Sequence, residues 1–334
     1  MTSRAIALAA RPSGFPTEDD FRLIEETLAE PAEGEVLVRI HYLSVDPYMR
    51  GRMNDARSYA DPVGIGQVMV GSAVGRVEKS RFDGLTEGDW VECYPGWREY
   101  AVVAGRSCRK LDPSLAPVST ALGILGMPGM TAYFGLLEIG QPKEGETVVV
   151  SGAAGAVGSV VGQIAKIAGC RAVGIAGSDE KVAWIRSLGF DAGFNYKTET
   201  DYVGAVRKAA PGGVDVYFDN VGGAISDAVI RCIKPFARIS ICGQISQYNL
   251  EKPEMGPRMM PILLVRQARA QGFLVFQFAD RYAEGRKRMA GWLREGKLQY
   301  REQFVDGLDN APLAFLDMLR GGNIGKQLVR VAAA

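Results

Sequence analysis

The sequence has 334 residues, of which 47% are hydrophobic and 23% are charged, and its 39 basic and 38 acidic residues give a formal net charge of +1. This length predicts about two domains, and the charge balance argues against nucleic acid or a membrane surface as the main partner. No segment approaches the roughly 20 consecutive apolar residues of a membrane span, and the five cysteines form no C-x-x-C pair, so we expect a cytoplasmic protein with free thiols.

The first third of the chain is predicted to be rich in β-strands. Short apolar runs alternate with Gly, Pro and Asp, a pattern that favours a rolled or barrel-like sheet. The runs that we interpret as strands are 5–10, 36–43, 68–77, 90–94 and 100–103.

The middle of the chain changes to alternating strands and helices, which predicts parallel strands with crossover helices in a doubly wound sheet. The expected strands are 147–150, 172–176, 190–194, 214–218 and 237–242, and the expected helices are 156–168, 179–188, 200–209 and 223–232. A strand at 272–276 and a helix at 280–294 complete this part, and a helix at 311–319 and a strand at 327–331 follow. The predicted fold class is therefore α/β, with a doubly wound (Rossmann) cofactor domain over 125–301 and a β-rich, barrel-like domain over 1–124 and 302–334.

A glycine-spaced turn, Ser151–Gly158, stands between the expected strand 147–150 and a helix. Such a turn lets backbone N–H groups and a helix N-terminus approach a pyrophosphate. The usual fingerprint is G-x-G-x-x-G, and here Ala153 stands at the first glycine, followed by Gly155 and Gly158.

The second expected strand of this domain ends at Gly177, where NAD-binding folds usually place an acid that binds the ribose 2′-hydroxyl. Gly177 has no carboxylate, and Lys181 lies one helical turn further on. These residues favour NADP(H) over NAD(H). The alternative is that Ser178 is only a helix N-cap and Lys181 only a surface lysine.

Six motifs in order resemble those of the zinc-independent medium-chain dehydrogenase/reductases, nearest to the branch of prostaglandin, alkenal double-bond and curcumin reductases. They are the segments 152–158, 177–181, 195–197, 217–223, 242–249 and 325–326, and the segment 43–53 is similar to the same branch. The resemblance covers nearly the whole chain and implies that the β-rich domain is GroES-like and catalytic.

The resemblance also implies roles for single residues. Gly155, Ala156, Val157 and Gly158 are expected at the pyrophosphate, and Lys181 and Tyr196 at the 2′-phosphate. The residues expected elsewhere along the cofactor are Asn220, Cys242, Gly243, Ser246, Tyr248, Phe273, Leu274, Val275 and Asn323. For Tyr196, Asn220, Phe273 and Val275 the alternative is a purely structural role in packing or in a turn.

The sequence offers few metal ligands. It has one histidine, His41, and reads Gly66-Gln67-Val68 where zinc-binding relatives show Gly-His-Glu. Three or four converging ligands are needed for zinc, so we expect no metal site and interpret His41 as a half-buried strand residue.

A metal-free site suits the reduction of an activated alkene. Hydride addition to the β-carbon of an α,β-unsaturated aldehyde or ketone leaves an enolate, which hydroxyl donors can stabilise. Tyr248 is the first candidate donor, and Tyr48 and Tyr59 are candidate substrate-pocket residues by the resemblance. Arg50 and Arg52 are interpreted as surface charges, with contact to a loop or a polar substrate end as the alternative.

We therefore expect an NADPH-dependent reductase of conjugated carbonyl compounds. The alternatives are an NADPH quinone reductase and a non-catalytic NADPH-binding protein. The resemblance implies a homodimer that forms through the cofactor domains.

Overall fold

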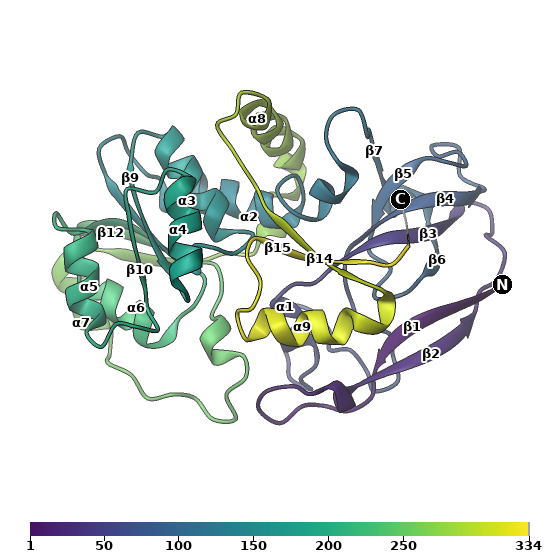
Figure 1. Ribbon diagram of the computed structural model, residues 1–334, viewed down its shortest axis with the longest axis horizontal. Helices are drawn as coiled ribbons and strands as arrows, with labels where there is room; N and C mark the ends of the chain where they lie inside the picture. The colour runs from purple at the N-terminus through teal and green to yellow at the C-terminus, as the bar shows by residue number, and fades with distance from the viewer. Residues whose placement is uncertain (333–334) are drawn as a thin grey trace. The chain divides into compact units, whose positions relative to one another are not determined.

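Two units make up the chain, each with its own sheet and its own hydrophobic core. The structure is a computed structural model that describes residues 1–332. The central unit is Ile124–Arg301, and the split unit combines Met1–Gly123 with the segment that begins at Glu302. The boundary expected between residues 124 and 125 lies one residue after the observed division. Figure 1 labels the elements of both units.

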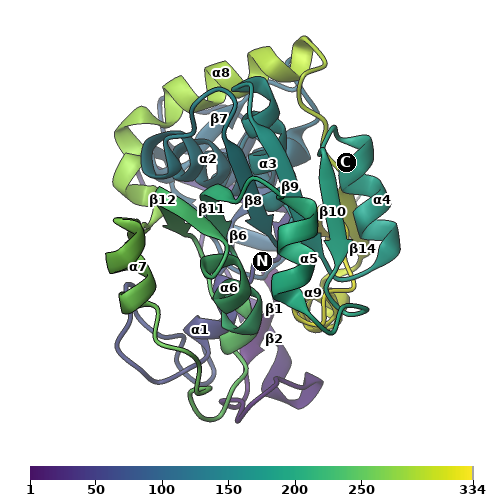
Figure 2. The ribbon, with the colours of Figure 1, turned by 90° about the vertical axis from the view of Figure 1, so that its left-hand side faces the viewer.

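The central unit contains a parallel sheet whose strand order reverses in the middle. Among the described residues it has six strands in the order β10-β9-β8-β11-β12-β13, and Figure 2 shows β12, β11, β8, β9 and β10 side by side in that order. Because the chain returns from β10 to β11 on the other side of β8, the order reverses between β8 and β11. Doubly wound sheets bind ligands beyond the carboxyl ends of the strands at this point. The predicted fold class of this unit is confirmed.

Most elements of the central unit lie within a few residues of their expected positions. Its strands are β8 (Thr147–Ser151), β9 (Arg171–Ala176), β10 (Ala192–Asn195), β11 (Val214–Asp219), β12 (Ile233–Ile241) and β13 (Arg269–Gly272). Its α-helices are α2 (Met127–Phe134), α3 (Gly158–Ile167), α4 (Asp179–Ser187), α5 (Tyr202–Ala209), α6 (Gly223–Ile230), α7 (Met260–Arg266) and α8 (Tyr282–Arg294). Tighter or wider helical turns are η4 (Gly135–Gly140), η5 (Ile245–Gln247) and η6 (Val275–Arg281).

The segment after β12 differs from the sequence-based expectation. The strand expected at 272–276 is wrong, since β13 ends at Gly272 and Val275 begins η6. The reason is that the neighbouring strand β12 ends there. Gly272 pairs with Ile241, the last residue of β12, so the residues after Gly272 have no strand beside them with which to pair. Helix α7 was not expected, because its apolar run is too short to be distinguished from a strand or loop by pattern alone.

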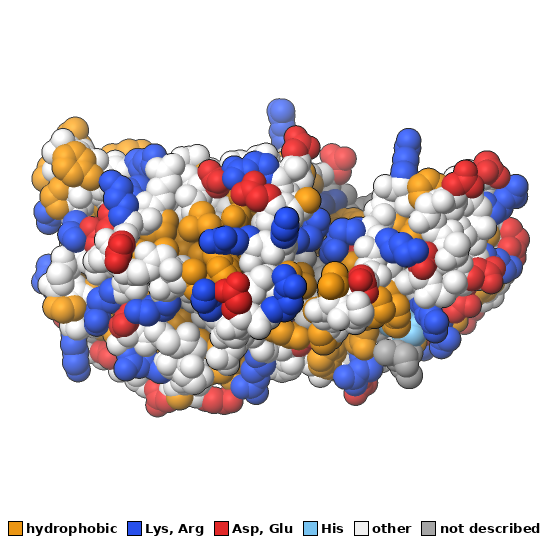
Figure 3. All heavy atoms as spheres, turned by 90° about the horizontal axis from the view of Figure 1, so that it is seen from above, with side chains coloured by type: hydrophobic (Ala, Val, Ile, Leu, Met, Phe, Trp, Pro, Cys, Tyr) orange, Lys and Arg blue, Asp and Glu red, His pale blue; other side chains and the backbone are white. Residues whose placement is uncertain are grey.

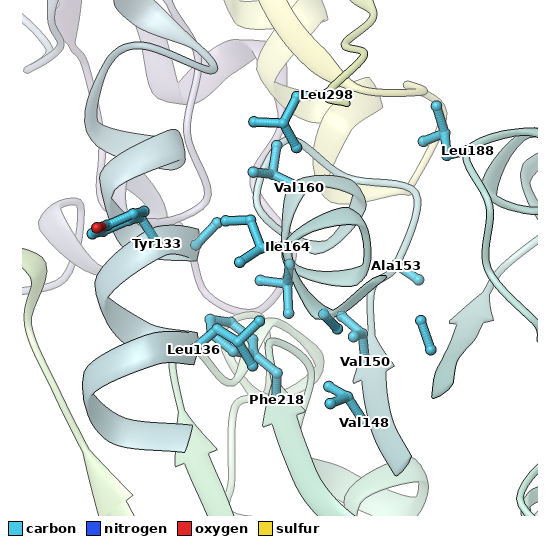
Figure 4. Packing of buried hydrophobic residues seen from close by; sticks show 14 of the residues in the cluster. Tyr133, Leu136, Val148, Val150, Ala153, Val160, Ile164, Leu188, Phe218 and Leu298 are labelled. Carbon is cyan, nitrogen blue, oxygen red and sulfur yellow. The ribbon is translucent and has the colours of Figure 1, made fainter. Parts of the chain in front are cut away.

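The core of the central unit explains why β8 is apolar throughout. Val148 and Val150 of β8 are fully buried, and Figure 4 shows them near Phe218 of β11 and below Ile164 of α3. A parallel strand with helices on both faces has no solvent-facing side, so continuous apolar sequence is favoured over alternation.

The split unit is built from mostly antiparallel strands. Its main sheet, within residues 1–332, has the strand order β14-β15-β3-β4-β5-β7, with β6 paired to β3, and β1 and β2 form a separate antiparallel pair. Only β14 and β15 of these described strands pair in parallel. The prediction of a β-rich second domain is confirmed.

Several bounds in the split unit differ from the predicted ones. Strand β4 begins at Ala73 and not at Val68, because Val68 makes only an isolated bridge to Ala7. Strands β2, β7 and β14 were not expected. The strands are β1 (Thr2–Leu8), β2 (Phe21–Thr27), β3 (Glu35–Ser44), β4 (Ala73–Ser80), β5 (Trp90–Cys93), β6 (Tyr100–Ala104), β7 (Arg109–Leu111), β14 (Glu302–Asp306) and β15 (Lys326–Arg330). The helical segments are η1 (Glu18–Asp20), α1 (Tyr48–Arg52), η2 (Gly105–Ser107), η3 (Val118–Leu122), η7 (Leu308–Asn310) and α9 (Ala311–Leu319).

The charges of the surface are mixed in sign. On the face drawn in Figure 3, Lys and Arg side chains are interspersed with Asp and Glu side chains. None of the helices in residues 1–332 has the length and apolar character of a membrane span.

Candidate functional site

The glycine turn between β8 and α3 has the backbone that a phosphate cradle needs. Gly152 has a φ of 60°, in the left-handed region that favours glycine. A Cβ on Gly158 would lie 2.3 Å from the Gly152 carbonyl oxygen and 2.8 Å from the Cα of Ala153. A side chain at Gly158 would therefore fill the turn, and glycine allows helix α3 to begin against it.

Ala153 occupies the first fingerprint position without strain. It is fully buried, its N–H donates to the Ile175 carbonyl at 3.0 Å, and its φ is not positive. Gly152 supplies the tight turn one residue earlier, so alanine is compatible with the next position. The N–H of Gly155 donates back to the Gly152 carbonyl at 3.0 Å, whereas Val157 and Gly158 open α3, where N–H groups have no acceptor within the helix.

A buried carboxylate, Asp219 at the end of β11, joins the loops at the strand-order reversal. Asp219 is only 2% exposed to solvent. The Asp219 carboxylate accepts six hydrogen bonds. Three come from the hydroxyls of Ser151, Tyr217 and Ser226, at 2.8–3.0 Å. The other three come from the backbone N–H groups of Val221 and Gly222, at 3.0 and 2.9 Å, and from the side-chain amide of Gln244, at 3.0 Å. The sequence predicted a functional role for the next residue, Asn220, but not for Asp219.

Asn220 is fixed on the same network. Its N–H donates to the Ser151 hydroxyl at 2.9 Å, and its side-chain amide donates to the Ser151 carbonyl at 2.8 Å. Ser151, Asp219 and Asn220 thus join the carboxyl ends of β8 and β11.

Replacement of Asp219 by Asn is expected to destabilise the protein by about 3 kcal/mol, since an amide NH₂ group would face donors in a buried site. Urea unfolding of the variant measures this change. Asp227→Asn on α6 is the matched control, because burial raises the pKa of the Asp227 carboxyl, so its negative charge does not stabilise the folded state. Equal stability of the two variants would contradict a supporting role for Asp219.

Tyr248 lies in the loop after β12, and its hydroxyl accepts a hydrogen bond from the N–H of Gln244 at 3.2 Å. Burial raises the pKa of the Tyr248 hydroxyl above its usual value, so the group stays protonated at neutral pH. A hydroxyl that accepts a backbone hydrogen bond retains its own hydrogen for donation. Because Gln244 also binds Asp219, Tyr248 is connected to the network that holds the glycine turn.

The other residues expected around this loop are held by backbone contacts. The N–H groups of Cys242 and Gly243 donate to the Asp219 carbonyl at 2.8 and 3.1 Å. A Cβ on Gly243 would lie 3.2 Å from the Tyr248 hydroxyl oxygen, so glycine makes room for that hydroxyl. Ser246 donates its hydroxyl to the Val221 carbonyl at 2.7 Å. Burial raises the pKa of the Cys242 thiol to about 12, which keeps it neutral.

Lys181 lies in the first turn of α4, and its N–H is capped by the Ser178 hydroxyl at 3.2 Å. The aromatic ring of Tyr196 lies against Gly177, where an added Cβ would be 3.1–3.3 Å from the ring. Tyr196 is fixed by its N–H, which donates to the Ala176 carbonyl at 3.0 Å. Gly177 therefore stands where NAD-binding folds usually have the acid that binds the ribose. The Tyr196 hydroxyl lies beside Gly177, and Lys181 follows one helical turn later.

The three residues expected beneath the nicotinamide differ in burial. Phe273 is buried and contacts Phe218 edge to face, with ring centroids 6.2 Å apart. Leu274 is 37% exposed, and Val275 packs against the core at the start of η6. The interpretation of these residues as one continuous strand is wrong, for the pairing reason given above.

In the split unit, the hydroxyls of Tyr48 and Tyr94 lie 2.6 Å apart. Burial, then the nearby Asp46 carboxylate, raises the pKa of Tyr48 well above its usual value, and burial also raises the pKa of Tyr94. Tyr59 is 52% exposed, and its negative form would raise the pKa of Tyr48. Tyr94 was missed by the sequence analysis, because its pairing with Tyr48 spans 46 positions and leaves no local pattern.

The segment before Tyr48 is held by a buried ion pair. Lys326, only 4% exposed, donates to the Asp46 carboxylate at 2.8 Å and to the Val45 carbonyl at 2.7 Å. Burial lowers the pKa of the Lys326 ammonium. Just before β15, Asn323 donates its side-chain amide to the Gly325 carbonyl at 2.9 Å.

Arg50 is not a surface residue, so the preferred interpretation of it is wrong. It is 3% exposed and donates to the Gly14 carbonyl at 2.8 Å and to the Asn54 side chain at 2.5 Å. These contacts join α1 to the loop after β1 and correspond to the loop-orienting alternative.

The metal-ligating side chains of the described residues do not cluster: no group of three or more His, Cys, Asp or Glu residues among 1–332 could hold an ion. His41 is buried, not half-buried, and packs edge-on against Trp90 with ring centroids 4.8 Å apart.

A parallel sheet with a glycine turn at its reversal point, attached to a β-rich unit, defines the class of two-domain, dinucleotide-dependent oxidoreductases. The chain matches the family described as the N-terminal domain of oxidoreductase over residues 4–111 and the zinc-binding dehydrogenase family over residues 156–290. It is 47% identical to the NADPH-dependent curcumin reductase of Escherichia coli, over 99% of this chain and 97% of the relative. It is 45% identical to prostaglandin reductase 1 of Rattus norvegicus, over 95% of each.

The crystal structure of CurA from Vibrio vulnificus in complex with NADPH superposes with a TM-score of 0.95 at 47% identity, covering 99% of this chain and all of that one. The chain therefore belongs to the zinc-independent medium-chain dehydrogenase/reductases, in the branch of the prostaglandin and curcumin reductases.

Proposed function

We propose that the protein is an NADPH-dependent reductase of the carbon–carbon double bond in α,β-unsaturated aldehydes and ketones. The observation on which this rests is the Asp219 network, which ties the glycine turn after β8 and the Tyr248 hydroxyl to the same reversal point of the sheet. The glycine turn would hold the cofactor that donates hydride, and the protonated Tyr248 hydroxyl at the same edge of the sheet would stabilise the enolate that hydride transfer produces.

The residues of the central unit fit a phosphorylated dinucleotide. The cradle that a Cβ at Gly158 would fill accommodates the pyrophosphate, with Gly155, Ala156 and Val157 beside it. Lys181 and the Tyr196 hydroxyl, next to the bare Gly177, would bind the 2′-phosphate by charge and by hydrogen bonding. The remaining contacts are proposed for Asn220, Cys242, Gly243, Ser246, Phe273, Leu274, Val275 and Asn323, as the family resemblance implies.

Bound NADPH would supply hydride to the β-carbon of the substrate, which leaves negative charge on the carbonyl oxygen. Tyr248 donates a hydrogen bond to that oxygen, and its raised pKa keeps the donor protonated at neutral pH. The hydroxyls of Tyr48 and Tyr94 in the split unit lie 2.6 Å apart, and Tyr48 and Tyr59 are proposed as substrate-binding residues because the family resemblance implies it. Asp46 and Lys326 hold the segment that leads into Tyr48.

A substrate panel tests the proposal. Purified protein with NADPH is offered 2-nonenal, its saturated counterpart nonanal, a quinone or no acceptor, and NADPH consumption and products are measured. Conversion of 2-nonenal to nonanal is expected, with no turnover of nonanal itself. Turnover of the quinone alone would support a quinone reductase, and tight NADPH binding without any turnover would support a non-catalytic protein.

The protein is further proposed to be a homodimer that forms through the central unit. Strand β13 is the edge of the sheet, with three of its four residues exposed. Helix α7, which packs against β12 next to it, exposes Met260, Leu264 and Val265 by 69%, 79% and 76%. An unpaired edge beside an apolar helix face supports self-complementary pairing with a second copy.

Substitution of Leu264 by Glu is expected to shift the protein from dimer to monomer in light scattering, because a charge would be buried at the contact. Leu313→Glu, at an exposed position of the otherwise mostly buried helix α9 in the split unit, is the control and should leave the mass unchanged. A monomeric unsubstituted protein would refute the proposal.

A cytoplasmic location is also proposed, because all five cysteines are free thiols. Cell fractionation with compartment markers checks this location.

A further inference from the structure

Cys93 and Cys108 lie opposite each other where two paired strands of the split unit end. Strands β5 and β7 are antiparallel, with Glu92 opposite Arg109. One residue further in this register, Cys93 ends β5 and Cys108 directly precedes β7. Cα atoms of directly opposed residues lie about 4.5–5.5 Å apart, which is within the range of a disulfide.

The two thiols also point to the same side of the strand pair. The side chains of Glu92 and Arg109 meet on one face, with a hydrogen bond of 2.7 Å. Since successive side chains of a strand alternate between faces, Cys93 and Cys108 share the opposite face. The interaction of the two thiols raises the pKa of Cys93 and lowers the pKa of Cys108.

The two cysteines differ in accessibility as well. Cys93 is 4% exposed, whereas Cys108 is partly exposed. An oxidant from solvent therefore reaches Cys108 first, and Cys108 is also the thiol that ionises more readily. Cys93 is placed behind it as a resolving thiol.

We propose that Cys93 and Cys108 form a reversible disulfide when the protein meets a hydroperoxide. The Cys108 thiolate attacks one oxygen of hydrogen peroxide and becomes a sulfenic acid, and the hydroxide that leaves takes up a proton to give water. The Cys93 sulfur then attacks the Cys108 sulfur, and the sulfenic hydroxyl leaves as a second water. Two thiols are oxidised to one disulfide while one peroxide is reduced to two waters.

The other cysteines have different surroundings. The Cys170 thiol donates to the Lys143 carbonyl at 3.1 Å, and Cys232 contacts the Val203 carbonyl at 3.8 Å. Burial raises the pKa of both thiols and of Cys242, so none of the three ionises as readily as Cys108.

The experiment treats the folded protein with hydrogen peroxide, blocks remaining thiols, and digests it with trypsin without reduction. Cleavage after Arg81, Arg98, Arg106 and Arg109 gives peptides 82–98 and 107–109. The expected product is these two peptides joined, with a loss of about 2 Da in the intact mass that dithiothreitol reverses. Separate peptides with Cys108 oxidised to a sulfinic acid would overturn the proposal.

Two variants sharpen the test. In Cys93→Ser the joined peptide is absent, and dimedone should label a sulfenic acid on Cys108. Cys232→Ser is the matched control and should form the joined peptide as the unsubstituted protein does. Circular dichroism of each variant establishes that it is folded. A joined peptide that forms only in urea-unfolded protein would also overturn the proposal, because the folded register would then not be its cause.

Discussion

Replacement of Tyr248 by Phe is expected to lower kcat for 2-nonenal by about 100-fold and to leave the KM for NADPH nearly unchanged. The hydroxyl accepts the Gln244 N–H and retains its own hydrogen, which is the donor proposed for the enolate oxygen. Removal of one such donor typically costs a factor of about 100 or more in rate. Initial rates at saturating NADPH measure the change.

The pH dependence of kcat gives a second readout for Tyr248. A donor must be protonated, and its raised pKa moves the loss of the proton to higher pH. The kcat of the unsubstituted protein should therefore be insensitive to this group near neutrality and fall only at a pH above that at which an ordinary tyrosine ionises. In Tyr248→Phe this alkaline fall should be absent.

The matched control for Tyr248 is Tyr300→Phe, at a partly exposed tyrosine of the central unit. It removes the same atom and should retain full kcat. Unchanged turnover in Tyr248→Phe would exclude this hydroxyl from the reaction. A fall in Tyr48→Phe alone would then assign the donor to the tyrosine pair of the split unit.

Lys181→Ala is expected to raise the KM for NADPH by about 10- to 100-fold, which corresponds to the loss of one charge-assisted contact with the 2′-phosphate. The KM for NADH should stay the same, because NADH has a hydroxyl in place of that phosphate. The Ser178 cap binds the backbone N–H of Lys181, so the substitution leaves the start of α4 intact. Initial rates with each cofactor measure the ratio.

The control for Lys181 is Lys208→Ala, on the exposed side of α5. It removes the same charge from the same unit and should leave both KM values unchanged. Equal effects of Lys181→Ala on NADPH and NADH would refute contact with the 2′-phosphate. Added salt should reduce the ratio of the KM for NADH to the KM for NADPH, since it screens the contact between Lys181 and the 2′-phosphate at a partly exposed site.

Much of the central unit could be predicted because its signals are local. Continuous apolar strands, glycine at Gly158 and an N-cap at Ser178 each depend on a few neighbouring residues. The strand expected at 272–276 failed because a strand needs a partner, and β12 ends at Ile241. The apolar residues of 272–276 favour a strand by type, but they contain no information about where the neighbouring strand β12 ends.

The candidate site was predicted less completely than the fold. Asp219 stands in the segment 217–223 that the resemblance singled out, but its importance depends on six donors brought from β8, β11, α6 and two loops. Tyr94 and Cys108 likewise gain their significance from partners far away in the sequence. Arg50 was misjudged because a charged residue next to Gly51 is usually exposed, and its acceptors, which include the Asn54 side chain and the Gly14 carbonyl, are known only from the structure.

The sequence by itself determined the alternation of strands and helices, the glycine turn, the absence of an acid at Gly177 and the membership of a family. These properties follow from residue type and short-range spacing. The tertiary structure alone decided which polar groups meet: the donors around Asp219, the hydroxyl pair of Tyr48 and Tyr94, the ion pair of Asp46 and Lys326, and the opposed thiols of Cys93 and Cys108. Burial and strand register set these contacts, and both depend on residues that are distant in the chain.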